Sequence, residues 1–137
     1  MLSVLAIHGV PIECINQAAT SYHVPATLIL SVLSIENGRI GSAIRNRNGT
    51  FDYGPMQINS VWLPQLQAYG YSQEQLQYDP CLNVAAGAWI LSQKIANASS
   101  PWQGVGDYHS KTSRLNYSYQ AKVYNVFQLL SSYLYNP

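Results

Sequence analysis

The chain has 137 residues, of which 47% are hydrophobic, so it can bury the core of one domain and is not a disordered protein. Only 9% of the residues are charged and the net charge is +1, which excludes the basic surface that binding to nucleic acid requires. The 11 tyrosines suit an uncharged, hydroxyl-rich ligand such as a sugar chain, although a low-charge surface with no ligand has the same composition.

Residues 1–10 are apolar but short, and they lack the basic leader and the small-residue cleavage site of a signal peptide. We interpret them as an N-terminal segment after an absent or removed signal peptide, followed by one domain over residues 11–137. No apolar run is long enough to cross a membrane, so no transmembrane segment is predicted. Cys14 and Cys81 are too far apart for a CxxC redox or zinc motif, and their spacing fits a disulfide as well as two buried thiols.

The first half of the domain begins with two predicted helices. Pro11 opens a segment that carries apolar residues at helical spacing as far as Tyr22. Pro25 is placed as the first residue of a second helix and Gly38 as its C-terminal cap. Residues 28–35 between them are apolar nearly all round, so this helix should be buried.

The next segment has a different pattern. Residues 39–51 form a polar loop, and a short β-hairpin near residues 48–53 is the only strand pairing that the pattern allows. Ser60 is predicted to cap a short helix that runs to Gly70.

N-cap residues mark the beginnings of the later helices. Ser72, with Gln75 three residues later, has the spacing of a capping box. Asp79-Pro80 and Ser100-Pro101 each supply an N-cap followed by proline at the first helical position. A last amphipathic helix is predicted over residues 113–135, with an apolar stripe at Leu115, Tyr119, Val123, Val126, Phe127, Leu130 and Leu134. The sequence therefore predicts one mostly α-helical domain.

Glu36 ends the buried helix and shares a face with Val32 and Leu33. A carboxylate there loses hydration, and the negative end of the helix dipole also disfavours its charge, so the pKa of Glu36 should be raised. A carboxylic acid that stays protonated near neutral pH is what general-acid catalysis needs. The position alone also allows Glu36 to turn into solvent or to pair with Arg39 or Arg45.

Residues 52–62 read Asp-Tyr-Gly-Pro-Met-Gln-Ile-Asn-Ser-Val-Trp. Together with Ser34-x-Glu36 at the end of the preceding helix, this run resembles the lysozyme-like superfamily. The likeness continues at Asp79, Pro80, Cys81, Asn83, Ala86, Gly87, Leu91, Trp102, Gly106–Ser110, Tyr119, Lys122 and Val123. It covers roughly residues 11–130, as one domain would. The sequence is most similar to the small lytic transglycosylases (SLT domain) of secretion, conjugation and pilus systems, whose cysteine pair is placed like Cys14 and Cys81 and favours a disulfide.

The resemblance implies a lysozyme-like helical domain with a substrate groove and a peptidoglycan lytic transglycosylase activity. Such an enzyme cleaves the β-1,4 bond between N-acetylmuramic acid and N-acetylglucosamine and forms 1,6-anhydro-N-acetylmuramic acid. Glu36 is the implied catalytic residue, acting first as acid and then as base. The implied location is the periplasm, and the implied form is a monomer without cofactor or metal. There the enzyme would open the cell wall for a secretion, conjugation or pilus machine. Its expected partners are glycan strands and components of that machine.

The same likeness implies a set of substrate-binding residues, namely Ser34, Tyr53, Met56, Gln57, Asn59, Tyr108, His109 and Tyr119. Several of them have an alternative structural role: Gln57 and Asn59 could tie down their own loop, while Tyr53, Met56 and Tyr119 could belong to the core. Pro55 stands where relatives usually have an aliphatic residue. The chain also has Tyr-His-Ser at residues 108–110, where many transglycosylases have Tyr-Asn-Ala-Gly.

Asp52 leaves two mechanisms open. Animal-type lysozymes have a catalytic Asp before the same Tyr-Gly-x-x-Gln-Ile-Asn run, so Glu36 and Asp52 together would predict a hydrolytic muramidase. Transglycosylases of the secretion-associated type also commonly have Asp at this place, and the single cysteine pair and the Tyr108 and Tyr119 regions favour them. A non-catalytic glycan-binding module is a further alternative, which an intact Glu36 disfavours.

Overall fold

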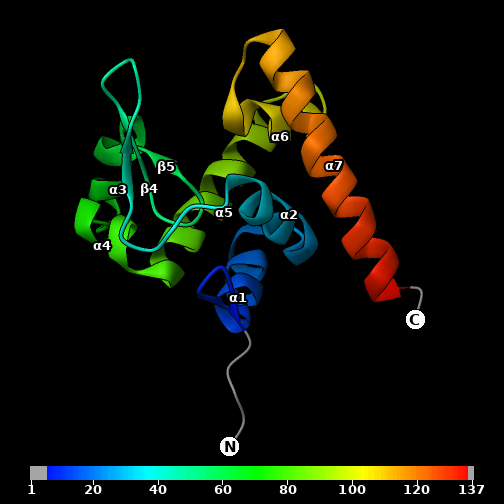
Figure 1. The fold of residues 1–137 in the computed structure, drawn as a ribbon, viewed down its shortest axis with the longest axis horizontal. Coiled ribbons are helices and arrows are strands. Elements are labelled where there is room, and N and C mark those ends of the chain that lie inside the picture. Colours follow the sequence, from blue (N-terminus) through cyan, green and yellow to red (C-terminus); the bar gives the residue numbers. More distant parts are fainter. Residues whose placement is uncertain (1–5, 136–137) are drawn as a thin grey trace, which may run out of the picture.

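The computed structural model describes residues 6–135 and confirms a mostly α-helical domain with short antiparallel strands. Its α-helices are α1 (Ile12–Tyr22), α2 (Ala26–Glu36), α3 (Leu63–Ala68), α4 (Gln73–Tyr78), α5 (Pro80–Ala96), α6 (Pro101–His109) and α7 (Ser113–Tyr135). In Figure 1, α3, α4 and a small sheet lie to one side of the central helix α5, and α6 and α7 lie to the other. Helix α7 also packs against α2, and α1 packs against α5.

The small sheet has three strands rather than the two of the predicted hairpin. β3 (Ala43–Arg45) pairs with β4 (Phe51–Tyr53), and β4 pairs with β5 (Ile58–Asn59), all antiparallel. The hairpin thus begins earlier than residue 48, because residues 46–50 form its turn, with Gly49 at a positive φ of 85°. Side chains in this turn support it, since Asn48 accepts hydrogen bonds from the backbone N–H and the hydroxyl of Thr50.

The predicted helix caps are mostly confirmed. Ser72 and Gln75 form the capping box, Asp79 accepts hydrogen bonds from the first turn of α5, and Ser100 caps α6. Ser60 was wrongly predicted as a cap. The carboxamide of Asn59 caps the 3-10 helix η1 (Ser60–Trp62) that precedes α3, whereas the Ser60 hydroxyl accepts a hydrogen bond from the backbone of Phe51 and ties this turn to β4.

The two ends of α2 lie close to the predicted positions. Pro25 is the N-cap rather than the first helical residue, and Asn37 rather than Gly38 adopts the left-handed conformation that ends the helix. Gly38 is required for another reason: a Cβ at this position would collide with the carbonyl oxygen of Gly54. The backbone N–H of Gly38 donates to the carbonyl of Pro55, so the end of α2 is fastened to the loop between β4 and β5.

Helix α7 has the predicted bounds, but its buried stripe begins one residue later than predicted. Leu115 is 38% exposed, whereas Asn116 is buried and donates to the carboxylate of Asp107 and the carbonyl of Ser110. These bonds satisfy the buried amide, and Gly106 leaves the space that it occupies. Tyr119 and Val123 are buried as predicted, and the side chain of Leu134 lies outside the described part of the chain.

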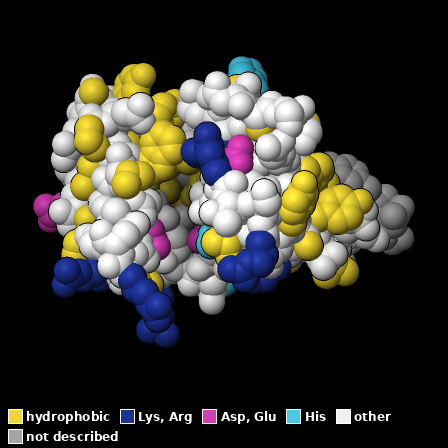
Figure 2. Space-filling view, turned by 90° about the horizontal axis from the view of Figure 1, so that it is seen from above, with side chains coloured by type: hydrophobic (Ala, Val, Ile, Leu, Met, Phe, Trp, Pro, Cys, Tyr) yellow, Lys and Arg dark blue, Asp and Glu magenta, His cyan; other side chains and the backbone are white. Residues whose placement is uncertain are grey.

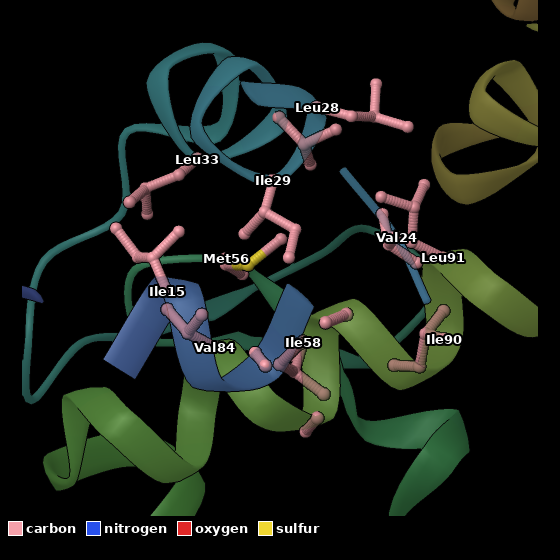
Figure 3. Close-up of a cluster of buried hydrophobic side chains, with 14 of the residues drawn as sticks. Ile15, Val24, Leu28, Ile29, Leu33, Met56, Ile58, Val84, Ile90 and Leu91 are labelled. Carbon is pink, nitrogen blue, oxygen red and sulfur yellow. The ribbon is translucent and has the colours of Figure 1, made fainter. Parts of the chain in front are cut away.

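The core lies where α1, α2, α5 and the β4–β5 loop meet (Figure 3). Its fully buried members include Ile15, Ile29, Leu33, Met56, Val84 and Leu91. A disulfide joins Cys14 of α1 to Cys81 at the start of α5, with their Cα atoms 5.3 Å apart. Because it links residues 67 positions apart, it should stabilise the fold by about 4 kcal/mol in the chain-entropy model.

Of the predicted N-terminal segment, residues 6–10 are described and residues 1–5 are not. β1 (Ala6–Ile7) pairs with β2 (Val10–Pro11), and Val10 is fully buried. β2 contacts α1 and α5, so this hairpin packs onto the domain. Among the helices of residues 6–135, none combines the length and apolar character that a membrane crossing needs.

Candidate active site

A cleft of about 450 Å³ lies between the half of the molecule that carries the sheet and the half that carries α6. Viewed from above in Figure 2, the surface is hollowed between these two halves, with acidic side chains inside the hollow and hydrophobic ones along it. The cleft is lined by Glu36, Asn46, Asp52, Gln57, Asn59, Val61, Trp62, Lys94, Asp107, Tyr108, His109, Ser110 and Lys111.

Glu36 reaches the cleft from the last residue of α2. The pKa of its carboxyl group is raised from 4.5 to about 7. Burial is the largest cause of the rise, the hydrogen bond from Tyr119 opposes it, and the negative charge of Asp52 adds to it. The raised pKa agrees with the prediction from the apolar helix. The hydrogen-bond partner of Glu36 is the neutral phenol of Tyr119, and Arg39 and Arg45 are exposed.

Tyr119 and His109 cover the acid from α7 and α6. The Tyr119 hydroxyl, buried together with its ring, donates a hydrogen bond to Oε2 of Glu36. Burial and the charge of Glu36 raise the pKa of Tyr119, so the phenol remains a donor. The imidazole of His109 stacks on the Tyr119 ring with centroids 4.9 Å apart and planes 11° from parallel. Burial and the charge of Lys122 lower the pKa of His109, which favours its neutral form.

Tyr108, the neighbour of His109 on α6, ties two elements of the site together. Its hydroxyl donates to the carbonyl of Met56 at 2.8 Å and so connects α6 to the β4–β5 loop. Burial raises the pKa of Tyr108, and the charges of Glu36 and Asp52 raise it further, which keeps this phenol protonated too.

The loop that carries Gln57 is bound from several directions. Asn83 on α5 is fully buried, and its amide accepts from the N–H of Met56 while donating to the carbonyls of Tyr53 and Leu76, each at 2.8 Å. The Gln57 side chain donates to the carbonyl of Gly54 at 3.0 Å. Gly54 and Gln57 both have positive φ angles, of 64° and 53°, which fold the loop back beneath the end of α2.

Asp52 and Asn59 face each other across β4 and β5. The Asn59 amide donates to Oδ1 of Asp52 at 3.0 Å and to the hydroxyl of Thr50 at 3.1 Å. Both side chains line the cleft with Glu36. Asp52 is therefore placed to act on a ligand and on the charge of Glu36, while Asn59 fixes its orientation.

The structure brings six of the sequence-predicted site residues together in the cleft lining: Glu36, Asp52, Gln57, Asn59, Tyr108 and His109. The other four lie beside or beneath it. Tyr119 lies behind the acid, and the Ser34 hydroxyl donates to the carbonyl of Leu30 within α2. Tyr53 and Met56 are buried, and the Met56 sulfur packs where a Cβ on Gly87 would approach it to 2.6 Å.

Sequence reasoning assigned no ligand role to Trp62 and Lys94, which also line the cleft. The Lys94 ammonium lies 5.4 Å from the centre of the Trp62 ring, and Trp62 packs edge-on against Trp89 with centroids 5.7 Å apart. Trp62 ends the 52–62 run and could have been singled out as a stacking surface. Lys94 carried no comparable signal. Among residues 6–135, no three His, Cys, Asp or Glu side chains are grouped as metal ligands would be.

The helical domain, its small sheet and the buried acid at the end of α2 define a lysozyme-like domain. Residues 13–126 match the model of the transglycosylase SLT domain, so the chain belongs to this family. Protein IpgF of Shigella flexneri is 36% identical over 102 residues, covering 74% of this chain and 67% of IpgF. Invasion protein IagB of Salmonella typhimurium is 36% identical over 110 residues, covering 80% and 69%. A peptidoglycan-binding-like protein of Escherichia coli O157:H7 is 28% identical over 130 residues, covering 86% and 78%.

Proposed function

We propose that this protein is a peptidoglycan lytic transglycosylase and that Glu36 is its catalytic acid and base. The observation that carries the proposal is a carboxyl group in the cleft with a pKa of about 7 and a hydrogen bond from a buried phenol. A pKa near neutrality lets one group donate a proton and then take one back. Membership of the transglycosylase SLT family supports the same reaction.

The reaction needs no second carboxylate and no water. Protonated Glu36 gives its proton to the glycosidic oxygen, and the bond from this oxygen to C1 of N-acetylmuramic acid breaks. The resulting Glu36 carboxylate takes the proton of the C6 hydroxyl of the same sugar as its oxygen bonds to C1. The products are a free 4-hydroxyl on N-acetylglucosamine and 1,6-anhydro-N-acetylmuramic acid, and Glu36 is protonated again. Because nucleophile and electrophile belong to one ring, their effective concentration is high.

The rest of the cleft suits an N-acetylated glycan. Gln57 carries an amide group, Tyr108 and Ser110 carry hydroxyls, and Trp62 offers an aromatic face against which a sugar ring can pack. Asn59 also lines the cleft, but its amide already donates to Asp52 and Thr50, so it serves mainly to hold Asp52. Tyr119 and His109 are positioned to fix the acid rather than the sugar.

We further propose that the enzyme acts in the periplasm as a monomer and locally opens the wall for a secretion, conjugation or pilus apparatus, some of whose components would be its partners. The disulfide supports an oxidising compartment. The similarity to a protein named as an invasion protein supports a link to such an apparatus. Fractionation of cells that express a tagged chain tests the periplasmic location, and recovery in the cytoplasm would contradict it. Cross-linking in the envelope fraction tests the association with components of the apparatus.

Mass spectrometry of digested sacculi tests the chemistry. The wild-type protein should release muropeptides one water lighter than hydrolytic products, and Glu36→Gln should release none while keeping the fold. A Glu36→Gln protein that still releases products would remove Glu36 from its role. If the wild-type protein binds glycan strands but releases no muropeptides, a non-catalytic glycan-binding module would be favoured.

A hydrolytic muramidase is the second candidate because Asp52 lines the same cleft and its charge raises the pKa of Glu36. In that mechanism Asp52 would support cleavage by water, and the products would have reducing ends. Reducing-end muropeptides alone in the same digest would favour it over the transglycosylase.

A further inference from the structure

We propose that a second, aromatic pocket outside the active-site cleft binds a further sugar of the glycan strand. This pocket, called the aromatic pocket below, is lined by Tyr22, Leu66, Tyr69, Tyr71, Ala86 and Trp89. The inference deepens the proposed function, because the strand that enters the cleft would continue into this pocket.

The aromatic pocket is formed where α1, α3 and α5 approach one another, and its volume of about 340 Å³ is sufficient for a small ligand. Tyr69, just beyond α3, is 71% exposed, and its ring meets that of Trp89 at a centroid distance of 5.8 Å. A tyrosine that is this exposed stabilises little by burial of its own surface. Its ring is therefore available to a ligand.

One pair of contacting rings links the lining of the aromatic pocket to the lining of the active-site cleft. Trp62 lines the cleft, Trp89 lines the aromatic pocket, and the two indoles are in edge-to-face contact at 5.7 Å. Trp62, Trp89 and Tyr69 thus form a row of contacting rings, of which only Trp62 lines the cleft with Glu36.

The lining selects the chemistry of the ligand. The residues around the aromatic pocket include no charged side chain, so a peptide stem with free carboxylates would find no ionic partner there. Sugar rings present an apolar face that packs on aromatic rings and hydroxyls that hydrogen-bond at their edge. Tyr71 supplies such an edge: burial raises its pKa, and its hydroxyl remains protonated beside that of Tyr22. The lining fits an uncharged N-acetylhexosamine.

Binding of N-acetylglucosamine oligomers to the Glu36→Gln protein tests the inference without turnover. Affinity should rise with length from the disaccharide onward and rise again once the oligomer is long enough to pass Trp62. Tyr69→Ala should weaken only the longer oligomers, by about fivefold, which corresponds to about 1 kcal/mol. Tyr117→Ala is the matched control, because Tyr117 is 70% exposed on α7 and does not line the aromatic pocket.

The three tryptophans give an internal readout in the same titration. In NMR spectra, the indole N–H signal of Trp62 should shift when short oligomers bind. The indole N–H signal of Trp89 should show an additional shift only when long oligomers bind. Trp102 packs against Tyr124 and Phe127 and should stay unchanged. In Tyr69→Ala the additional shift of Trp89 should be lost, while circular dichroism reports the intact fold.

Equal affinity of Tyr69→Ala and its parent for long oligomers would overturn the inference, as would a Trp89 signal that ignores oligomer length. Either result leaves the product-mass test of Glu36 unaffected, because the titration measures binding alone. Conversely, failure of Glu36→Gln to stop lysis would leave the length-dependent binding standing.

Discussion

The Tyr119 hydroxyl donates a hydrogen bond to the Glu36 carboxyl group and so joins residues that are 83 positions apart in the sequence. A hydrogen bond to a carboxylate favours the charged form, whereas burial and the nearby charge of Asp52 favour the neutral form. The pKa of about 7 is the balance of these opposing influences.

Removing the hydroxyl in Tyr119→Phe should raise the pKa of Glu36 above its present value, because the interaction that lowers it is lost. The alkaline limb of the profile of kcat/KM against pH should therefore move to higher pH. The rate at pH 6 should fall by about tenfold, since the hydrogen bond also orients the carboxyl group. An unchanged or lower midpoint would show that Tyr119 does not act on the charge of Glu36.

Replacing His109 separates a positioning role from a contact with substrate. His109→Phe keeps an aromatic ring stacked on Tyr119, so it should retain kcat, whereas His109→Ala uncovers Tyr119 and should lower kcat severalfold. Steady-state kinetics on soluble glycan strands measure both. A rise in KM in both variants at constant kcat would instead assign His109 a contact with the acetamido group.

Asp52→Asn removes the negative charge that raises the pKa of Glu36, so the alkaline midpoint should move slightly to lower pH. The anhydro products should persist, because the proposed reaction needs one carboxylate. Asp107→Asn is the control: it removes another carboxylate that lines the cleft and that does not shift the pKa of Glu36. Complete loss of activity in Asp52→Asn alone would favour the hydrolytic mechanism.

Glu36 should make stability depend on pH. Its pKa is about 7 in the folded protein against an ordinary value of 4.5, so the folded state binds the proton more tightly than the unfolded state. The contribution of Glu36 to the free energy of unfolding is fully present below pH 4.5. It is lost as the pH rises through 7, and the total loss is about 3 kcal/mol. The side chain of Glu36→Gln carries no charge, so this variant does not lose stability in the same way. Its free energy of unfolding, relative to that of the wild type, should therefore increase as the pH rises from 4.5 through 7.

Urea unfolding at pH 4.5 and pH 8 measures this difference, with Glu74→Gln on the exposed surface of α4 as the control. An advantage of Glu36→Gln that is the same at both pH values would mean that burial does not hold the acid protonated.

Helices and caps could be predicted because their signals are local. The capping box at Ser72 and the whole of α7 follow from residues within a few positions of each other. Ser60 and Leu115 were misplaced for the opposite reason. Ser60 accepts a hydrogen bond from Phe51 on β4, nine residues earlier in the chain. Helix α7 turns Asn116 inward because Asp107 and Gly106 of α6 accommodate its amide.

The site shows the same division. The apolar helix around Glu36 predicts an acid with a raised pKa, and the motif predicts which amides surround it. The orientation of Met56 could not be predicted in the same way. Its side chain faces the core and its carbonyl accepts from Tyr108, because Gln57 has a positive φ and Gly87 has no side chain. Trp62 and Tyr69 flank α3 at helical spacing, but Trp89 lies on α5, and only the fold brings its ring between theirs.

Asn83 has a further consequence for substrate binding. Its amide already fixes three backbone groups, on Tyr53, Met56 and Leu76, before any glycan arrives. The conformational entropy of the β4–β5 loop is therefore lost during folding and not during association. Even a short fragment of the strand would meet a cleft wall in its final conformation, so glycan capture should not wait for a loop to close.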